Sequence, residues 1–296
     1  MAASILWVFV DGLGLTAPEV AAAPSPGLDA RLGGPALVDL PLPLGGPCRR
    51  FALDATLGVD GLPGTATGQA TLVTGANAAA AMGRHMQAYP GPRLRAWMDA
   101  VGSLFARSAA RGVRSALLTS YPVEARETAL RYAARTGGAR LAGEGSPGPP
   151  LYPNLGLGPA ASQRASADGA AAEGAALLAA RLARPYDLCV VETDVCDRAG
   201  HLREGREAAT RRALAHVDRF LDALRRALGP DDLVVVASDH GNAEDPTSRG
   251  HSRGRVPVFA LQATAAGPWT GPELDGDLTR FGPWLEALLA GGWGGG

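Results

Sequence analysis

The stretch LVVVASDHGNAEDPTSRGHSRGRVPVFAL, residues 233–261, contains two apolar runs, 233–237 and 256–261, on either side of a segment rich in Asp, His and Gly. Short continuous apolar runs bounded by turn residues are typical of fully buried strands. Such strands belong to sheets that helices cover on both faces. The stretch therefore predicts an α/β protein in which polar side chains follow the end of a buried strand.

The rest of the chain extends this pattern. Further apolar runs predict strands at 5–10, 114–119 and 188–192. Helical periodicity is found between the runs, over 67–81, 94–111, 171–183 and 204–228. Alternation of strands and helices predicts a mostly parallel central sheet with helices on both faces. We expect loops at 17–47 and 143–163, and a single domain over residues 1–296.

Composition narrows the classes of function. The net charge is −1, which provides no general attraction for nucleic acid or an anionic membrane. The 28 basic residues are all arginines, which excludes a phosphate-loop lysine and a Schiff base. The three cysteines form no paired framework, and no apolar stretch is long enough to span a membrane. We therefore expect a cytoplasmic protein whose partner is a small molecule.

Polar clusters follow three of the predicted strands, and three of the five histidines fall in them. The residues are Asp11 after the first strand, Asp197 and His201 after 188–192, and Asp239, His240 and His251 after 233–237. Ligands of such sheets gather beyond the carboxyl ends of the strands. Carboxylates and imidazoles without thiolate suit Zn or Mn. Each cluster alone fits a turn or a surface pair, but together they predict a site for two divalent ions.

A fourth feature is GLPGTATGQATLVTG, residues 61–75, where small and hydroxyl residues open a helix after Pro63 and Gly64. A helix N-terminus presents unpaired N–H groups and a positive potential, which suit an anion. A threonine there is a candidate nucleophile if a metal ion lowers the pKa of its hydroxyl. The candidates are Thr65, Thr67, Thr71 and Thr74. Each of them also fits an ordinary capping or helical role.

In this order, the four features resemble the alkaline phosphatase superfamily, and in particular the branch with cofactor-independent phosphoglycerate mutase and phosphopentomutase. The phrase DRAGH matches that branch's Asp-x-x-Gly-His, and SDHGNAED followed by HSRGRVPV is similar to its two later metal segments. GTATGQATLVTGAN is similar to its nucleophile segment. The resemblance covers about 1–95 and 185–262, and it implies an alkaline-phosphatase-like fold.

The resemblance also implies residue roles. Alignment on Gly68 and Gly75 puts the nucleophile on Thr65. One ion would be held by Asp11, Thr65, Asp239 and His240, and the other by Asp197, His201 and His251. The substrate phosphate would bridge the ions, and a phosphothreonine intermediate would follow. Arg84 and His85, just past the nucleophile helix, are candidates for substrate contact, with a plain surface role as the alternative.

The chain departs from that branch in length, because residues 84–187 leave room for at most a small cap. A mutase must keep water from its intermediate, which a small cap makes harder. We therefore expect a phosphatase acting on a small phosphorylated metabolite. A phosphomutase of phosphoglycerate-mutase or phosphopentomutase type is the alternative, and a non-catalytic metal-stabilised module of the same fold is a further one.

Overall fold

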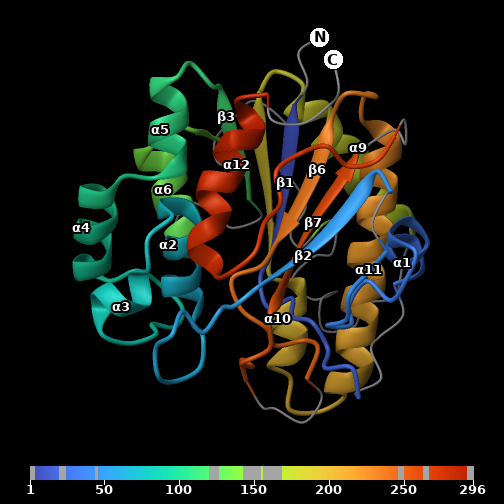
Figure 1. The fold of residues 1–296 in the computed structure, drawn as a ribbon, viewed down its shortest axis with the longest axis horizontal. Helices are drawn as coiled ribbons and strands as arrows, with labels where there is room; N and C mark the ends of the chain where they lie inside the picture. The colour runs from blue at the N-terminus through green and yellow to red at the C-terminus, as the bar shows by residue number, and fades with distance from the viewer. Residues whose placement is uncertain are drawn as a thin grey trace.

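The computed structural model describes residues 4–19, 25–43, 46–119, 127–142, 155, 169–245, 250–262 and 267–291. Within these ranges seven strands form one sheet in the order β2-β7-β6-β1-β5-β3-β4 (Figure 1). The strands are β1 (Ile5–Val10), β2 (Cys48–Leu53), β3 (Ser115–Leu118), β4 (Arg140–Ala142), β5 (Leu188–Thr193), β6 (Leu233–Ala237) and β7 (Val256–Gln262). Neighbours pair in parallel, except that β7 is antiparallel to both β6 and β2. The predicted mostly parallel α/β sheet is confirmed.

Helices cover both faces of this sheet (Figure 1). One face carries α1 (Pro26–Leu32), α9 (Gly169–Ala183) and α11 (Arg206–Ala227). The other carries α2 (Thr65–Thr74), α3 (Ala78–Met82), α4 (Pro92–Val101), α5 (Leu104–Ala110), α6 (Ala129–Thr136) and α12 (Phe281–Leu289). The short helix α10 (Val195–Gly200) follows β5 at the lower edge in Figure 1. The layers explain why β1 and β6 are apolar throughout and why β5 is apolar up to Glu192.

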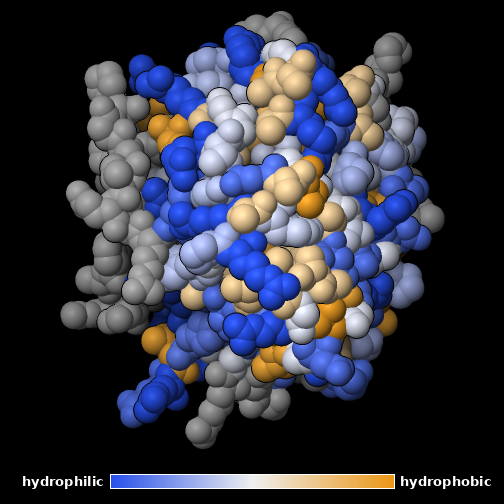
Figure 2. All heavy atoms as spheres, turned by 90° about the vertical axis from the view of Figure 1, so that its left-hand side faces the viewer, coloured by the Kyte–Doolittle hydropathy of each residue, from blue (hydrophilic) through white to orange (hydrophobic). Residues whose placement is uncertain are grey.

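Strand β1 shows how one strand serves two cores. Leu6, Val8 and Val10 pack toward α1, α9 and α11, whereas Ile5, Trp7 and Phe9 pack toward the helices of the other face. Successive side chains of a strand point to opposite faces, so both sets are buried. Figure 2 shows the outer side of the second layer, where hydrophobic residues lie scattered among hydrophilic ones. The amphipathic helices thus direct their apolar sides inward.

Several expectations about elements need correction. The segment 17–47, predicted as a loop, contains α1, which begins with Pro26 at its first turn and ends before Gly33. The predicted helix 67–81 is two helices, α2 and α3, because Gly75 adopts a left-handed conformation. The predicted helix 94–111 likewise divides into α4 and α5 at Gly102. Strands β2 and β4 were not predicted.

The predicted cap region, residues 84–187, is only partly described. Its described parts supply α4, α5, α6 and α9 to the helical layers and β3 and β4 to the sheet. The predicted loop 143–163 lies outside the described residues except for residue 155. The single-domain organisation and the small cap therefore stay predictions. Among the described helices, none is both long and apolar enough to cross a membrane.

Candidate metal centre

Backbone hydrogen bonds join the loops that follow β1, β5 and β6. The amide of Asp11 donates to Thr193 O (2.9 Å), and that of Asp197 donates to Asp11 O (3.1 Å). Ala243 N donates to Gly12 O (3.0 Å). Gly12 has a φ of +74°, and a Cβ there would lie only 2.7 Å from the Asp197 Cα. Only glycine lets the loops approach this closely, so the backbone itself gathers the three polar clusters.

The first predicted ligand group comes together around His240. Its Nε2 lies 2.9 Å from Thr65 Oγ1, 3.1 Å from Asp11 Oδ1 and 3.7 Å from Asp239 Oδ2. His240 and Asp239 are fully buried. They are adjacent in sequence, and they converge because β6 ends at Ala237, before either of them.

The second predicted group comes together around Asp197. Its Oδ1 lies 3.3 Å from His201 Nε2 and 3.5 Å from His251 Nε2. One donor atom from each of these three residues lies within 4.8 Å of the other two. Asp197 meets the same criterion with Asp11 and His240. The rings of His240 and His251 stack with centroids 3.6 Å apart, so the two groups adjoin.

The oxygen and nitrogen ligand atoms in this cluster are suited to divalent cations. Both carboxylate oxygens of Asp239 and one of Asp11 are buried without a hydrogen-bond partner. Burial raises the pKa of both carboxyls well above the usual value. Burying a carboxylate that receives no hydrogen bond costs free energy of folding unless a cation balances its charge. The carboxylate oxygens without a hydrogen-bond partner are therefore suited to bind metal ions.

His251 is held in the form that a metal ligand needs. Its Nδ1 lies 2.7 Å from the carbonyl of Pro63, which can only accept, so Nδ1 carries the proton. Nε2 is then left with its lone pair on the side of Asp197. Burial lowers the pKa of His251 to about 4, so the ring is neutral at neutral pH. The hydrogen bond to Pro63 fixes both the tautomer and the orientation of the His251 ring.

Of the four threonine candidates, Thr65 is the one in contact with the cluster. It is the first residue of α2 and is nine-tenths buried. The hydroxyls of the others bond to carbonyls nearby in the chain: Thr67 to Gly64, Thr71 to Thr67 and Thr74 to Ala70. Thr65 therefore has the position that a nucleophile requires.

The expectation of unpaired N–H groups at the start of α2 needs correction. The amides of Ala66 and Thr67 both donate to Met86 O, at 3.0 and 3.4 Å. The segment after α3 thus supplies the hydrogen-bond acceptor for these two amides of α2. These two donors are therefore already paired and are not available to an anion.

Among the described residues, Arg84 and His85 make no hydrogen bond or ion pair with the cluster. Arg84 is exposed on the surface. His85 Nε2 lies 3.0 Å from Thr56 O and 3.3 Å from Val59 O, so it supports the loop after β2. The predicted substrate contact of these two residues is untested and stays a prediction.

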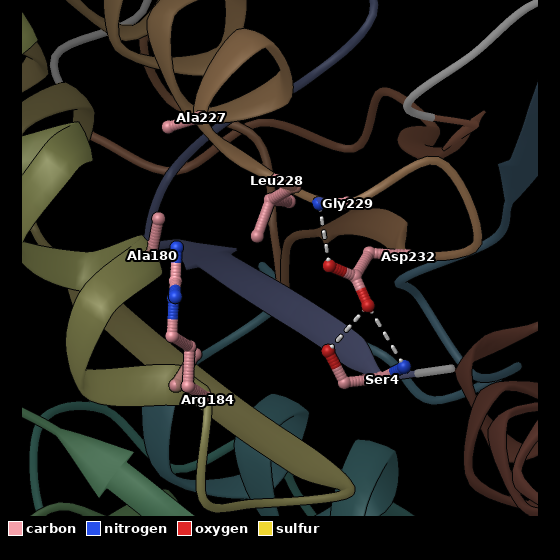
Figure 3. A pocket seen from close by; sticks show the side chains of 8 residues that line it. Ser4, Ala180, Arg184, Ala227, Leu228, Gly229 and Asp232 are labelled. Atoms are coloured by element: carbon pink, nitrogen blue, oxygen red, sulfur yellow. Dashed lines mark hydrogen bonds between the residues drawn. The ribbon is translucent and has the colours of Figure 1, made fainter. Parts of the chain in front are cut away.

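A cavity of about 400 Å³ opens over the cluster. Its lining consists of Leu62, Thr65, Gln87, Ala88, Asp197, His201, Gly250 and His251. A second cavity, of about 110 Å³, lies at the opposite end of β1 (Figure 3). Its one carboxylate, Asp232, accepts hydrogen bonds from Ser4 and Gly229. The first cavity is therefore the candidate substrate site.

One buried acid near the cluster was not predicted from the sequence. Glu192, at the end of β5, accepts hydrogen bonds from Thr119 Oγ1 (2.8 Å) and Thr128 Oγ1 (3.1 Å). Burial raises the pKa of Glu192 to about 7, although these hydrogen bonds oppose the shift. The only signal in the sequence was an acidic residue that ends an apolar run.

The raised pKa predicts how stability depends on pH. Between 4.5 and about 7 the folded protein keeps a proton on Glu192 that the unfolded chain releases. This contribution is complete below pH 4.5 and is lost as the pH rises through about 7. We expect Glu192→Gln to remove roughly 3 kcal/mol of pH dependence in the free energy of unfolding of metal-free protein. Urea unfolding from pH 4 to 8 measures it.

Glu207→Gln is the matched control, because Glu207 is an exposed residue on α11. It should leave the pH dependence as in the wild type. Parallel pH profiles for Glu192→Gln and the wild type would contradict the assignment.

Comparison with known proteins finds similarity to a metalloenzyme superfamily and to phosphopentomutases, one of the enzymes that the motifs resemble. The family model of the metalloenzyme superfamily matches residues 162–283. Phosphopentomutase from Shewanella frigidimarina is 39% identical over 87 residues, which cover 28% of this chain and 21% of the relative. Phosphopentomutase from Symbiobacterium thermophilum is 45% identical over 62 residues, covering 20% of this chain and 15% of the relative. The matched part is thus about a fifth or less of the length of these relatives.

Solved structures match over nearly the whole chain. Alkaline phosphatase from the Antarctic bacterium TAB5 superposes with a TM-score of 0.56 at 12% identity, covering 99% of this chain and 98% of that one. The cold-active alkaline phosphatase from a Shewanella species gives 0.58 at 11% identity, covering 97% and 99%. At this identity the likeness concerns the fold, and it confirms the fold class that the motifs indicated.

Proposed function

We propose that this chain, an alkaline-phosphatase-like metalloenzyme by its fold and family match, transfers the phosphoryl group of a small phosphorylated substrate with Thr65 as nucleophile. The observation that carries the proposal is the distance of 2.9 Å between Thr65 Oγ1 and His240 Nε2, within a buried cluster of carboxylates and imidazoles. The Thr65 hydroxyl lies on the first turn of α2, in a cluster whose buried carboxylate oxygens on Asp11 and Asp239 have no hydrogen-bond partner, which is rare in folded proteins. Phosphoryl transfer accounts for both features.

Two divalent ions, Zn or Mn, fit the ligand atoms. Asp11, Thr65, Asp239 and His240 would hold one ion, and Asp197, His201 and His251 the other. When bound, such ions neutralise charge on phosphoryl oxygens and lower the pKa of a coordinated hydroxyl.

The transfer of the phosphoryl group itself would involve Thr65 and a water molecule. Thr65 Oγ1 attacks phosphorus, the bond from phosphorus to the leaving oxygen breaks, and the proton lost by the threonine hydroxyl ends on that oxygen, so phosphothreonine and a free alcohol form. Water attacks the same phosphorus in the second step, which releases phosphate and restores the threonine hydroxyl. Burial of the cluster keeps its charges effective, because few water molecules screen them.

Access of water favours hydrolysis over internal transfer. The His201 side chain is 46% exposed, so one edge of the second ligand group faces solvent. A mutase must hold its phosphorylated intermediate away from water until the phosphoryl group returns to the substrate. We therefore propose a phosphatase. Phosphomutase activity is the second candidate, because the curated relatives that match this chain are phosphopentomutases.

Metal removal and reconstitution test the proposal. We expect exhaustive chelation to abolish hydrolysis of an aryl phosphate, and Zn or Mn to restore it. When the metal-loaded protein is incubated with a panel of sugar phosphates and other phosphometabolites, we expect free phosphate to be released. Formation of an isomerised product without free phosphate would identify a mutase. Full activity in protein shown by elemental analysis to be metal-free would refute the proposal. Stoichiometric metal uptake without any turnover would support a non-catalytic module.

A further inference from the structure

The side chain of Asn242 connects the two strand-end loops of the metal centre. Asn242 is fully buried and lies two residues after His240. Its Nδ2 donates to Asp197 Oδ1 at 2.7 Å and to Asp197 O at 3.3 Å. The loop after β6 therefore holds the carboxylate that α10 supplies to the centre.

Arg206, at the start of α11, completes the arrangement from the other side. Its Nη2 donates to Asn242 O at 2.8 Å and to Asn242 Oδ1 at 3.2 Å. A guanidinium has only donors and a carboxylate only acceptors, so the amide has one satisfactory orientation, with Nδ2 toward Asp197. Arg206 thus fixes which end of the amide faces the carboxylate.

The surrounding backbone leaves space for this contact. A Cβ at Gly200, the last residue of α10, would collide with the side-chain amide of Asn242. Glycine at this position lets the amide lie against the helix that carries Asp197.

We propose that Asn242 and Arg206 are positioning residues for Asp197. The atom that Asn242 holds, Asp197 Oδ1, is the one that lies 3.3 Å from His201 Nε2 and 3.5 Å from His251 Nε2. A hydrogen bond to one lone pair of that oxygen directs the other toward the two imidazoles. The inference rests on the proposed function only in taking Asp197 as a metal ligand.

The size of the effect follows from what such hydrogen bonds do in metal sites. Loss of an outer-shell partner costs roughly 10- to 100-fold in metal affinity. Asn242→Ala removes the donor and should fall within this range for one ion. Asn242→Asp should weaken binding at least as much, because it places a second carboxylate beside Asp197.

The experiment measures metal binding rather than turnover alone. The purified 296-residue chain is titrated with Zn against a competing chelator, and bound metal is counted by elemental analysis. Co²⁺ substitution adds a visible spectrum that reports ligand geometry. The variants are Asn242→Ala, Asn242→Asp, Arg206→Ala and Arg206→Lys. Arg211→Gln is the matched control on α11, because the Arg211 guanidinium pairs with Glu207 at the surface.

We expect weaker binding of one ion and an altered Co²⁺ spectrum in both Asn242 variants, a smaller loss in Arg206→Ala, and recovery in Arg206→Lys. Arg206→Ala keeps the proposal testable if an Asn242 variant fails to fold, because Arg206 is only partly buried. Unchanged affinity and spectrum in the variants, with normal uptake by the wild type, would overturn the positioning role alone. A wild-type chain that binds no divalent ion would overturn the proposed function as well.

Discussion

Thr65→Ala should lower the turnover of an aryl phosphate by roughly 10³-fold or more, because it removes the oxygen that attacks phosphorus. The Thr65 hydroxyl lies 2.9 Å from His240 Nε2, and alanine leaves that nitrogen without this partner. We expect the fold to persist, since the side chain that is lost is small. The kinetic constants give the size of the effect, and acid-quenched protein analysed by mass spectrometry should no longer carry a phosphoryl group on the 65–75 segment.

Two further variants define the role of the hydroxyl. Thr65→Ser keeps an oxygen at the same position and should retain the phosphorylated intermediate. Thr67→Ala is the matched control, because the Thr67 hydroxyl donates to Gly64 O and accepts from Met86 N. It should cost some stability and change turnover little. Wild-type turnover in Thr65→Ala would place the nucleophile on another residue.

The sequence identified the centre of the fold better than its edges. Strands β1 and β6 are buried on both faces and apolar throughout, and β5 is apolar up to Glu192, so the pattern is unambiguous. Strand β2 lies at the edge and pairs with β7 on one side, and its sequence CRRFAL includes two arginines with partly exposed side chains. An edge strand needs no continuous apolar run, and β4 has only three residues. Periodicity alone cannot separate such segments from loops.

The candidate site shows a similar division. Six of the seven predicted ligands follow strands, and they gather beyond the carboxyl ends of the central strands because the rule for parallel sheets depends only on strand direction. The seventh, Thr65, opens α2, and it was assigned by the resemblance of its segment to the family's nucleophile segment. Contacts between distant segments could not be predicted in this way. Asn242 bonds to a residue 45 positions earlier, and Thr119 and Thr128 reach Glu192 across 73 and 64 positions. The hydrogen bonds from the first turn of α2 to Met86 O also depend on the path of the segment after α3. Side-chain partners of this kind follow from tertiary packing, which a single sequence does not encode in a readable pattern.

Asp239→Asn should have opposite effects on the metal-free and the metal-loaded protein. Asp239 is fully buried, and neither of its carboxylate oxygens has a hydrogen-bond partner. Coulombic repulsion from Asp11 and Asp197 adds to the desolvation that raises its pKa. Without metal, asparagine of the same shape should therefore stabilise the fold, by about 1–3 kcal/mol. With metal, the variant should bind one ion less tightly, gain less stability from it and lose most of its turnover.

Unfolding in urea with and without Zn measures both effects, together with metal content and turnover of an aryl phosphate. Asp232→Asn is the matched control, because Asp232 lies at the far end of β1 and accepts hydrogen bonds from Ser4 and Gly229 (Figure 3). That variant should lose stability, because three donor groups lose an ionised acceptor, while metal uptake and turnover stay at the wild-type level. The sign of the change in metal-free protein thus distinguishes a carboxylate that lacks donors from one that has them. If Asp239→Asn destabilises the metal-free protein as Asp232→Asn does, Asp239 is a structural acceptor and the assignment of its oxygens to a cation is wrong.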